Sequence, residues 1–253
     1  MLPQQRREKI LDLIREDGQA KVMQLSEIFN VTEVTIRQDL EKLEKDGFVE
    51  REHGGAYLKN IGLNVKNIAL HKQERIAEKA AIARKALELI NDGDTIILDS
   101  GSTTTEIAKL ITGFKSLTVI TDSLNIALIL GGIPEINLVV TGGEFKAPTL
   151  SVTGQKAADF FVGLHVDKLF LATAGITLKS GLTYPSISDL VVKRAMIESA
   201  NEVYLVADSS KVGKSAFASL GALSLIDFLI TDSNISEADI NILKSNDIKI
   251  VVA

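Results

Sequence analysis

The sequence has 253 residues, more than one hydrophobic core usually holds, and its 45% hydrophobic content predicts a globular protein of two domains. Its net charge is −5, and residues 1–60 hold ten Lys and Arg against twelve Asp and Glu, which excludes a strongly basic nucleic-acid-binding surface there. Cysteine is absent and the three histidines are scattered, so we expect no metal and no cofactor. Signal-peptide and membrane-spanning patterns are absent too, which predicts a cytoplasmic protein.

Residues 1–58 have the pattern of a winged helix-turn-helix domain. Two short amphipathic helices are expected over residues 5–17 and 22–29, and a third begins after a gap too short for anything but a tight turn. Helices joined in this way cross steeply, which predicts a helix-turn-helix over about residues 20–39. Two short β-type runs around Gly54-Gly55 then predict a hairpin, the wing.

The third helix combines a face for packing with a face that is free to touch DNA. Thr32 is the expected N-cap, and Ile36, Leu40 and Leu43 fall on one buried stripe. Taken alone, this window is equally compatible with an ordinary amphipathic surface helix. The residues expected to contact DNA, from the polar face of this helix and from the wing, are Thr32, Glu33, Val34, Thr35, Arg37, Gln38, Arg51 and His53.

These DNA-facing residues should divide by what they touch. Thr32 and Thr35 are expected at phosphates, the rest of the helix face at base edges or thymine methyls in the major groove, and the two wing residues at the backbone or minor groove. Because the domain has more acids than bases, any positive patch must be local. The candidates for it are Arg6, Arg7, Lys9, Lys21, Arg37 and Arg51.

The rest of the chain predicts a linker and an α/β domain. Residues 59–70 are irregular and polar, and residues 71–90 predict a long helix with Ile76 on its apolar stripe. Short apolar runs then alternate with helical patterns, which predicts a mainly parallel sheet covered on both faces over residues 71–253. The expected strands are 95–98, 117–120, 136–140, 168–172, 203–206, 228–230 and 249–252. Less helical intervals at 144–151 and 215–224 leave room for extra strands or loops.

Small, polar and acidic residues follow the carboxyl ends of these strands, where open α/β sheets bind ligands. The segment Ser100 to Thr105 suits an anion, because Gly101 lets the backbone approach closely and the next helix offers free N–H groups and its positive dipole end. We also expect the three Thr hydroxyls of this segment to point outward. A phosphate fits these features, although N-caps and tight turns use the same residues for structural reasons alone.

Short stretches throughout the chain carry the signature of one protein family. They are LSEIF at 25–29, VTEVTIRQDL at 31–40, REHGGA at 51–56, LDSGSTTT at 98–105, GLT at 181–183, VKRAM at 192–196 and ADSSK at 207–211. In these stretches the sequence resembles the DeoR family of bacterial transcriptional regulators. The resemblance implies a sensor domain like ribose-5-phosphate isomerase, with a phosphorylated sugar as effector. Asp122, and Ser188-Asp189, depart from the family pattern and leave the identity of the sugar open.

The strand ends and the resemblance together define an expected effector site. Its residues are Asp99, Ser100, Gly101, Ser102, Thr103, Thr104, Thr105, Asp122, Gly142, Gly143, Gly175, Asp189, Lys193, Asp208 and Lys211. By the resemblance, Lys193, Arg194 and Lys211 bring positive charge to this edge. For Lys193 and Arg194 the alternative is a solvated helix face.

The features together predict a cytoplasmic repressor of a sugar-utilisation operon, with no catalytic residues, whose DNA binding is modulated by a phosphorylated sugar. Its expected partners are double-stranded operator DNA, the sugar effector and further copies of itself, as a dimer or tetramer, with no membrane. One alternative is an isomerase-like enzyme carrying a DNA-binding domain, because Asp99, Asp189 or Asp208 could supply a general base. Another is an α/β scaffold that only dimerises the DNA-binding domain.

Overall fold

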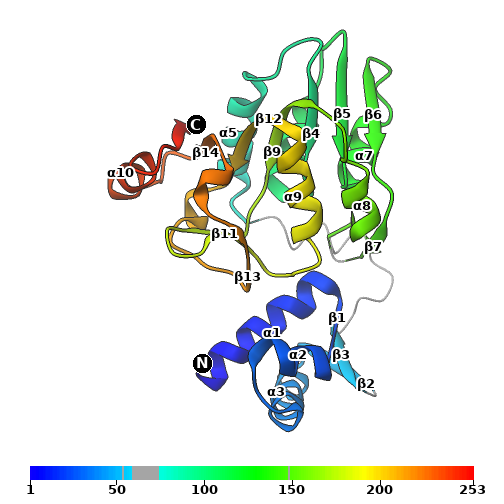
Figure 1. Ribbon diagram of the computed structural model, residues 1–253, viewed down its shortest axis with the longest axis vertical. Coiled ribbons are helices and arrows are strands. Elements are labelled where there is room, and N and C mark those ends of the chain that lie inside the picture. The colour runs from blue at the N-terminus through cyan, green and yellow to red at the C-terminus, as the bar shows by residue number, and fades with distance from the viewer. Residues whose placement is uncertain (53, 59–73, 148) are drawn as a thin grey trace. The chain divides into compact units, whose positions relative to one another are not determined.

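The computed structural model describes residues 1–52, 54–58, 74–147 and 149–253, and the chain divides into two compact units (Figure 1). One unit is built mainly from residues before position 72, and the other from nearly all residues after it. The expected linker, residues 59–70, lies outside the described residues, as does His53. Within the described ranges, no helix is long and apolar enough to cross a membrane.

The first unit has the three helices and the hairpin that the sequence predicts. Its elements are α1 (Pro3–Asp17), β1 (Gln19–Lys21), α2 (Val22–Phe29), α3 (Glu33–Lys45), β2 (Val49–Glu52) and β3 (Gly55–Leu58). The sequence analysis missed β1, which pairs antiparallel with β3 and gives the wing a third strand in the order β1-β3-β2. The left-handed residues Gly18 (φ 79°) and Asn30 (φ 51°) end α1 and α2.

The packing face of α3 is the one expected. Ile36, Leu40 and Leu43 are all buried. The Thr32 hydroxyl accepts a hydrogen bond of 3.3 Å from the Thr35 N–H, which confirms the predicted N-cap. The helix is therefore fixed at its start by the cap and along its length by burial, so its opposite face is presented in one defined orientation.

A buried ion pair joins α1 to α3. The Arg6 Nε lies 2.6 Å from an Asp39 carboxylate oxygen, and the Arg7 guanidinium lies 3.4 Å from the other oxygen. Arg6 and Asp39 are both buried. The expectation that Arg6 belongs to a DNA-facing patch is therefore wrong, because this arginine neutralises a carboxylate that α3 turns inward.

Replacing Asp39 by Ala should destabilise the N-terminal unit by about 3 kcal/mol, because Arg6 would keep its charge while losing its buried partner. The matched control is Arg15→Ala, which breaks an exposed pair with Asp12 and should change stability by less than about 1 kcal/mol. Urea unfolding of the full chain measures both. Equal losses of stability in the two variants would contradict a stabilising role for the buried Arg6–Asp39 pair.

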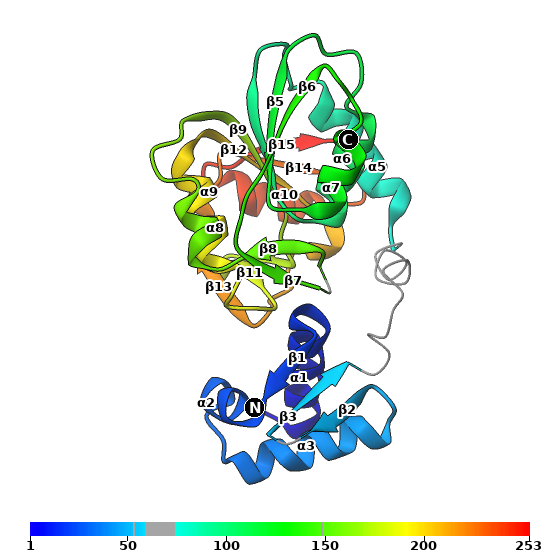
Figure 2. The same cartoon turned by 90° about the vertical axis from the view of Figure 1, so that its right-hand side faces the viewer.

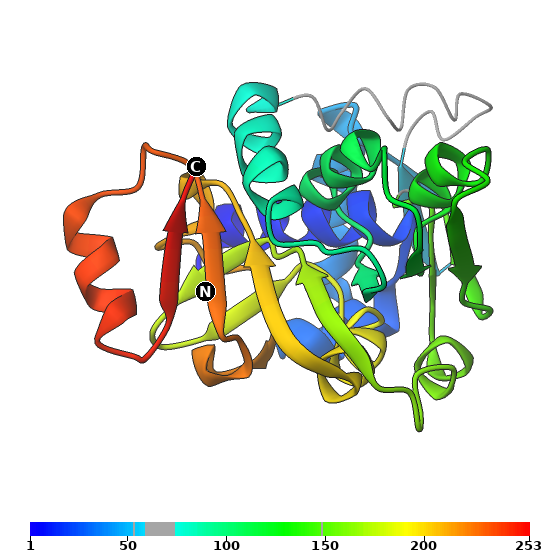
Figure 3. The ribbon, with the colours of Figure 1, turned by 90° about the horizontal axis from the view of Figure 1, so that it is seen from above.

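The second unit contains every strand that the sequence predicts. Its elements are α5 (Ile76–Leu87), β4 (Thr95–Leu98), α6 (Ser102–Leu110), β5 (Leu117–Thr121), α7 (Leu124–Leu130), β6 (Ile136–Val140), β7 (Glu144–Lys146), β8 (Ser151–Thr153), α8 (Gln155–Asp159), β9 (Val166–Leu171), β10 (Gly175–Thr177), β11 (Gly181–Tyr184), α9 (Leu190–Ser199), β12 (Ala200–Val206), the 3-10 helix η1 (Ser209–Lys211), β13 (Ala218–Gly221), the 3-10 helix η2 (Leu223–Leu225), β14 (Phe228–Thr231), α10 (Glu237–Lys244) and β15 (Lys249–Val252). The seven expected strands form one parallel sheet in the order β15-β14-β12-β9-β4-β5-β6. Figure 3 shows β15, in red, at its outer edge beside β14. The remaining strands form an antiparallel sheet, β10-β11-β13, and the pair β7-β8.

Helices cover both faces of the parallel sheet. In Figure 2, α5, α6 and α7 lie on one side of the strands and α8 and α9 on the other. Successive strand residues face opposite sides: Ile96 belongs to the core under α5 to α7, whereas Ile97 belongs to the core under α8 and α9. This three-layer α/β arrangement confirms the predicted fold class and explains why the strands read as continuous apolar runs.

The helix expected over residues 71–90 is shorter than predicted. It begins at Ile76 because Arg75 takes the left-handed conformation, with φ of 58°. Ile76 is 47% exposed, so its place on the buried stripe is wrong, and Ile82 and Ala86 are buried instead. Arg75 is held in this position by contacts to the sheet edge, described below.

Candidate DNA-binding and effector sites

The face of α3 predicted to meet DNA is open to solvent. Val34, Arg37 and Gln38 are exposed. The Arg37 guanidinium lies 2.6 Å from a Glu33 carboxylate oxygen, one turn earlier on the same helix. Exposed pairs at this spacing contribute only a few tenths of a kcal/mol, so a base edge or phosphate can readily displace Glu33 from Arg37.

Other polar residues of this surface hold it together. The Thr32 and Thr35 hydroxyls lie 3.0 Å apart and hydrogen-bond to each other. On the wing, the Arg51 N–H donates to a Glu44 carboxylate oxygen at 3.0 Å, which ties β2 to α3. The recognition face and the wing are therefore linked within the unit. The DNA contacts themselves stay a prediction.

The second candidate site lies where the sheet changes direction. The chain passes from β4 outward to β5 and β6, and then returns to the other side of β4 for β9, β12, β14 and β15. Loops leaving two such neighbouring strands diverge, and open α/β sheets bind ligands in the crevice between them. Here the loops come very close: a Cβ on Gly101 would lie 2.5 Å from the Ala172 Cβ. Glycine is required at this position for that reason.

A buried ion pair lies at this crevice. The Lys193 Nζ is 2.6 Å and 2.8 Å from the two carboxylate oxygens of Asp99, and it lies 4.9 Å from the centre of the Tyr184 ring. The Ala172 N–H donates to the same carboxylate at 3.0 Å. Burial is the largest single effect and acts to lower the pKa of Lys193, but the charges of Asp99, Tyr184, Asp122 and Asp189 together outweigh it and raise that pKa above its ordinary value.

The two neighbouring cations of α9, Lys193 and Arg194, differ in burial. Lys193 is buried against Asp99, so the solvated-face alternative is wrong for it. Arg194 is exposed and donates to the Leu220 carbonyl oxygen at 2.9 Å. Arg194 is therefore the one that lies on the outer helix face.

Asp122 is a buried carboxylate with an open hydrogen-bonding position. Its Oδ2 accepts a hydrogen bond of 2.9 Å from the Ser100 hydroxyl, but its Oδ1 has no hydrogen-bond partner among the described residues. Burial and the nearby Asp99 charge raise the pKa of Asp122 to about 7. A buried acceptor without a donor is unfavourable, so a ligand hydroxyl or amino group would stabilise this site.

The threonines of the anion-binding segment do not point outward as expected. The Thr104 hydroxyl donates to the Asp99 and Gly101 carbonyl oxygens, and the Thr105 hydroxyl donates to the Gly101 carbonyl at 2.6 Å. Thr103 is buried. These side chains close the loop onto the start of α6. The donors that remain for an anion are the backbone N–H groups in the first turn of α6, which have no partner within the helix, and the half-buried Ser102.

Asp208 belongs to a separate cluster around Arg75. The Arg75 guanidinium lies 3.0 Å from Asp208 and 3.5 Å from Asp232, both buried, and donates to the Ser209 hydroxyl at 3.1 Å. Burial is the largest single effect and acts to raise the pKa of Asp232, but the backbone and side-chain hydrogen bonds from Ser209 and Asn234 together outweigh it and lower that pKa. The expected effector residue Asp208 thus binds the Arg75 side chain just before α5, and Lys211 lies nearby at the end of η1.

The remaining predicted residues fall into two groups. Asp189, just before α9, lies close enough for its charge to act on Asp122 and Lys193. Close packing explains why two of the positions are glycine. A Cβ on Gly143 would lie 2.6 Å from the Thr153 carbonyl oxygen, and a Cβ on Gly175 would lie 2.4 Å from the Lys214 carbonyl oxygen. A Cβ on Gly142 would meet nothing within 4 Å. The site therefore centres on the ends of β4, β5 and β9.

Two further observations concern the acidic and basic side chains of this unit. Among the residues placed by the structure, no group of three or more His, Asp or Glu side chains is arranged to hold a metal ion. The sequence analysis missed Arg75, which carries no recognisable motif and meets its partners only after folding. The ends of β4, β5 and β9 thus bring together backbone donors, one ion pair and one carboxylate with an open acceptor.

The raised pKa of Asp122 predicts a pH dependence of stability. Between about pH 4 and 7 the folded protein holds a proton on Asp122 that the unfolded chain has lost, so stability falls as pH rises through this window, by at most about 1.4 kcal/mol per pH unit. Asp122→Asn should flatten that slope in urea unfolding, whereas Asp247→Asn, at an exposed site, should leave it unchanged. Parallel slopes for Asp122→Asn and the parent would refute a protonated Asp122.

Comparisons with known proteins cover nearly the whole chain. The DeoR-like helix-turn-helix domain matches residues 6–61, and the DeoR C terminal sensor domain matches residues 74–233. The HTH-type transcriptional regulator YulB of Bacillus subtilis is 36% identical over 99% of this chain and 96% of its own. The glycerol-3-phosphate regulon repressor of Escherichia coli is 32% identical over 90% of each chain.

Among solved structures, ribose 5-phosphate isomerase A from Methanocaldococcus jannaschii matches 53% of each chain, with 19% identity and a TM-score of 0.38. The two family domains together account for both units of the fold. High coverage by relatives of more than 30% identity agrees with them. This chain belongs to the DeoR family of transcriptional regulators.

Proposed function

We propose that this chain represses a sugar-utilisation operon in the cytoplasm and releases its operator when a phosphorylated sugar binds the crevice between β4 and β9. The observation that carries the effector half is the Asp122 Oδ1, a buried acceptor without a donor, at the same crevice as the start of α6. The relative named as the glycerol-3-phosphate regulon repressor supports a phosphorylated effector.

In the proposed effector site, the phosphate and the sugar hydroxyls would be bound by different groups. A phosphate would accept hydrogen bonds from the backbone N–H groups at the start of α6, where the helix dipole favours negative charge. A sugar hydroxyl would donate to the Oδ1 of the ionised Asp122 carboxylate. The Lys193–Asp99 pair would hold the flanking loops in place, since both of its partners are already bonded.

The same geometry favours a sensor over an enzyme. A lysine acts as a base or nucleophile only when it is deprotonated, and the Asp99 carboxylate raises the pKa of Lys193, which keeps it charged. Asp99 is bonded to that cation and to the Ala172 N–H. Asp122 and Asp189 are then the remaining candidate bases of this cluster, and product analysis on any sugar that binds separates binding from turnover.

The assembly we propose is at least a dimer, joined through the α/β unit. One winged-helix module buries only about 600 to 1,000 Å² of surface on DNA. Regulators of this kind therefore bind as pairs of DNA-binding domains on repeated half-sites. The exposed face of α3 would enter the major groove of each half-site.

Arg37→Ala should weaken binding to an operator by about 1 to 3 kcal/mol at matched salt, because Arg37 is placed to reach base edges from the exposed face of α3. The operator is obtained by selection from random duplexes with the parent protein. Lys45→Ala is the matched control: Lys45 also forms an exposed pair on α3, with Glu41 at 2.9 Å, but lies at the far end of the helix and should change affinity less. Unchanged affinity in Arg37→Ala would rule out this docking.

A panel of phosphorylated sugars should contain at least one that stabilises the protein by RT ln(1 + [L]/Kd), or about 2.7 kcal/mol at a hundredfold excess over Kd, while its unphosphorylated form does far less. Thermal unfolding measures the effect. By linkage, the same sugar should weaken operator binding, and it should be recovered chemically unchanged. Turnover would favour an isomerase-like enzyme, and no response across the panel would favour a scaffold.

Ser102→Asp should abolish the response to sugar phosphates while leaving operator binding intact. Ser102 is the first residue of α6, so an added carboxylate there stabilises the helix start but repels a phosphate. Ser102→Ala is the control and should keep most of the response. Loss of operator affinity in a folded Ser102→Asp protein would mean that the loop supports assembly and not ligand recognition.

A further inference from the structure

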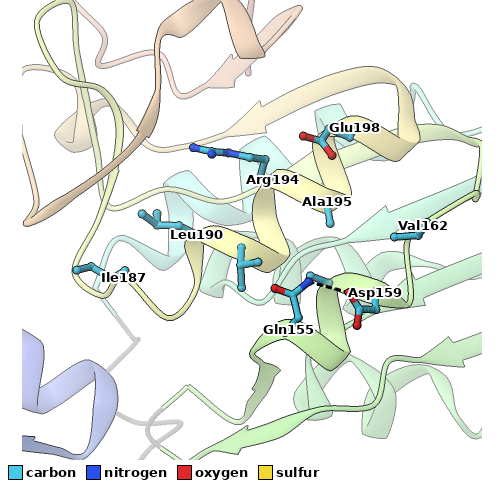
Figure 4. Close-up of a pocket in the computed structure, with 10 residues that line it drawn as sticks. Gln155, Asp159, Val162, Ile187, Leu190, Arg194, Ala195 and Glu198 are labelled. Carbon is cyan, nitrogen blue, oxygen red and sulfur yellow. Dashed lines mark hydrogen bonds between the residues drawn. The ribbon is translucent and has the colours of Figure 1, made fainter.

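Helix α9 has an outer face that the proposed effector site does not use. Its inner side buries Val192, Lys193 and Met196, and its outer side presents Arg194 and Glu198 to solvent. The short helix α8 runs beside it (Figure 4). The apolar residues at the rim of this surface are highly exposed: Val162, after α8, is 78% exposed and Ile187, before α9, is 56% exposed. We call this surface the α9 face.

Two hollows flank the outer ridge of α9. One, of about 420 Å³, lies between α8 and α9, and Figure 4 shows Gln155 and Asp159 on one side of it and Leu190, Arg194 and Ala195 on the other. The second, of about 310 Å³, lies between α9 and the chain around η2. Arg194 and Glu198 line both. The α9 face is therefore a charged ridge with a partly apolar groove on each side.

We propose that the α9 face is the contact between two copies of this chain, with the two α9 helices antiparallel about a two-fold axis that crosses α9 midway between Arg194 and Glu198. A ridge flanked by grooves can pack against a second copy of itself, since helix ridges fit into the grooves of a facing helix. Ala195, a small residue on the groove side of the ridge, leaves room for the two backbones to approach. The inference rests on the proposed function, which requires paired DNA-binding domains, and it names the surface that pairs them.

The charges of the ridge are self-complementary in this arrangement. Arg194 and Glu198 lie one helical turn apart on the same face. In an antiparallel pair, Arg194 of one copy faces Glu198 of the other, and the symmetry makes this contact twice. The exposed rim residues Val162 and Ile187 would be buried around it, as expected for the apolar part of a subunit contact.

A second copy fits the α9 face better than a small ligand does. Small-molecule sites depend on a few buried polar groups that fix the orientation of the ligand. In the groove between α8 and α9, the polar side chains Gln155, Asp159, Arg194 and Glu198 are all exposed. Exposed charges of both signs around apolar side chains are instead typical of the rim of a protein interface.

The test is a charge reversal followed by its rescue, measured by light scattering and sedimentation on the full chain without DNA. The parent should be at least a dimer. Arg194→Glu and Glu198→Arg should each weaken dimerisation at least tenfold, because each brings like charges together twice. The double variant Arg194→Glu/Glu198→Arg should restore it. Arg84→Glu, which reverses an exposed charge on α5, is the control and should leave the dimer unchanged.

The rescue separates loss of the contact from loss of the fold. Arg194→Glu also loses the hydrogen bond to the Leu220 carbonyl oxygen, and the double variant loses it too, so recovery of the dimer in the double variant must come from the charges. Thermal unfolding shows that each variant is folded. Single variants that remain dimeric, or a folded double variant that stays monomeric, would overturn this interface. A monomeric parent would instead overturn the oligomeric part of the proposed function as well.

Discussion

The buried ion pair between Lys193 and Asp99 is the contact on which the proposed effector site of the α/β unit depends. Lys193 lies on α9, which covers one face of the sheet, and Asp99 directly follows β4, three residues before α6 begins on the other face. The Asp99 carboxylate also accepts a hydrogen bond from the Ala172 N–H, directly after β9. One pair therefore fixes the two layers and the two strands at which the sheet changes direction. Loss of either partner would leave an uncompensated buried charge.

This pair also sets the chemistry available to a ligand. Because Lys193 is bonded to Asp99, the second carboxylate of the crevice, Asp122, is left without a cation in contact and with a pKa raised by burial and by Asp99. In the proposed site, a ligand that donates hydrogen bonds would relieve this unfavourable state, and the start of α6 would accept its negative group. Such a site would favour a phosphorylated polyol over an apolar molecule or a cation.

The sequence was sufficient for elements with a strong local pattern and insufficient for contacts made between distant segments. The seven parallel strands were predictable because each is a continuous apolar run, whereas β1 and the sheet β10-β11-β13 consist of three- or four-residue strands with no such run. The start of α5 was misplaced because Arg75 bonds to Ser209, 134 residues away, and no local signal reveals that. The prediction of outward Thr hydroxyls was wrong because helix capping and ligand binding use the same residue types. Only the folded loop shows that the Thr104 hydroxyl bonds to the Asp99 carbonyl oxygen and closes the loop.

Coupling between the effector crevice and the recognition helix is the central claim, and reciprocal linkage tests it most directly. The Kd of the most stabilising sugar phosphate is measured by calorimetry with the free protein and with the protein saturated by operator DNA. The account predicts that operator weakens sugar binding by the same factor by which the sugar weakens operator binding, typically about 5- to 150-fold. Equal sugar affinity in the two states would contradict it, because a ligand with no preference between the free and DNA-bound forms cannot release the operator.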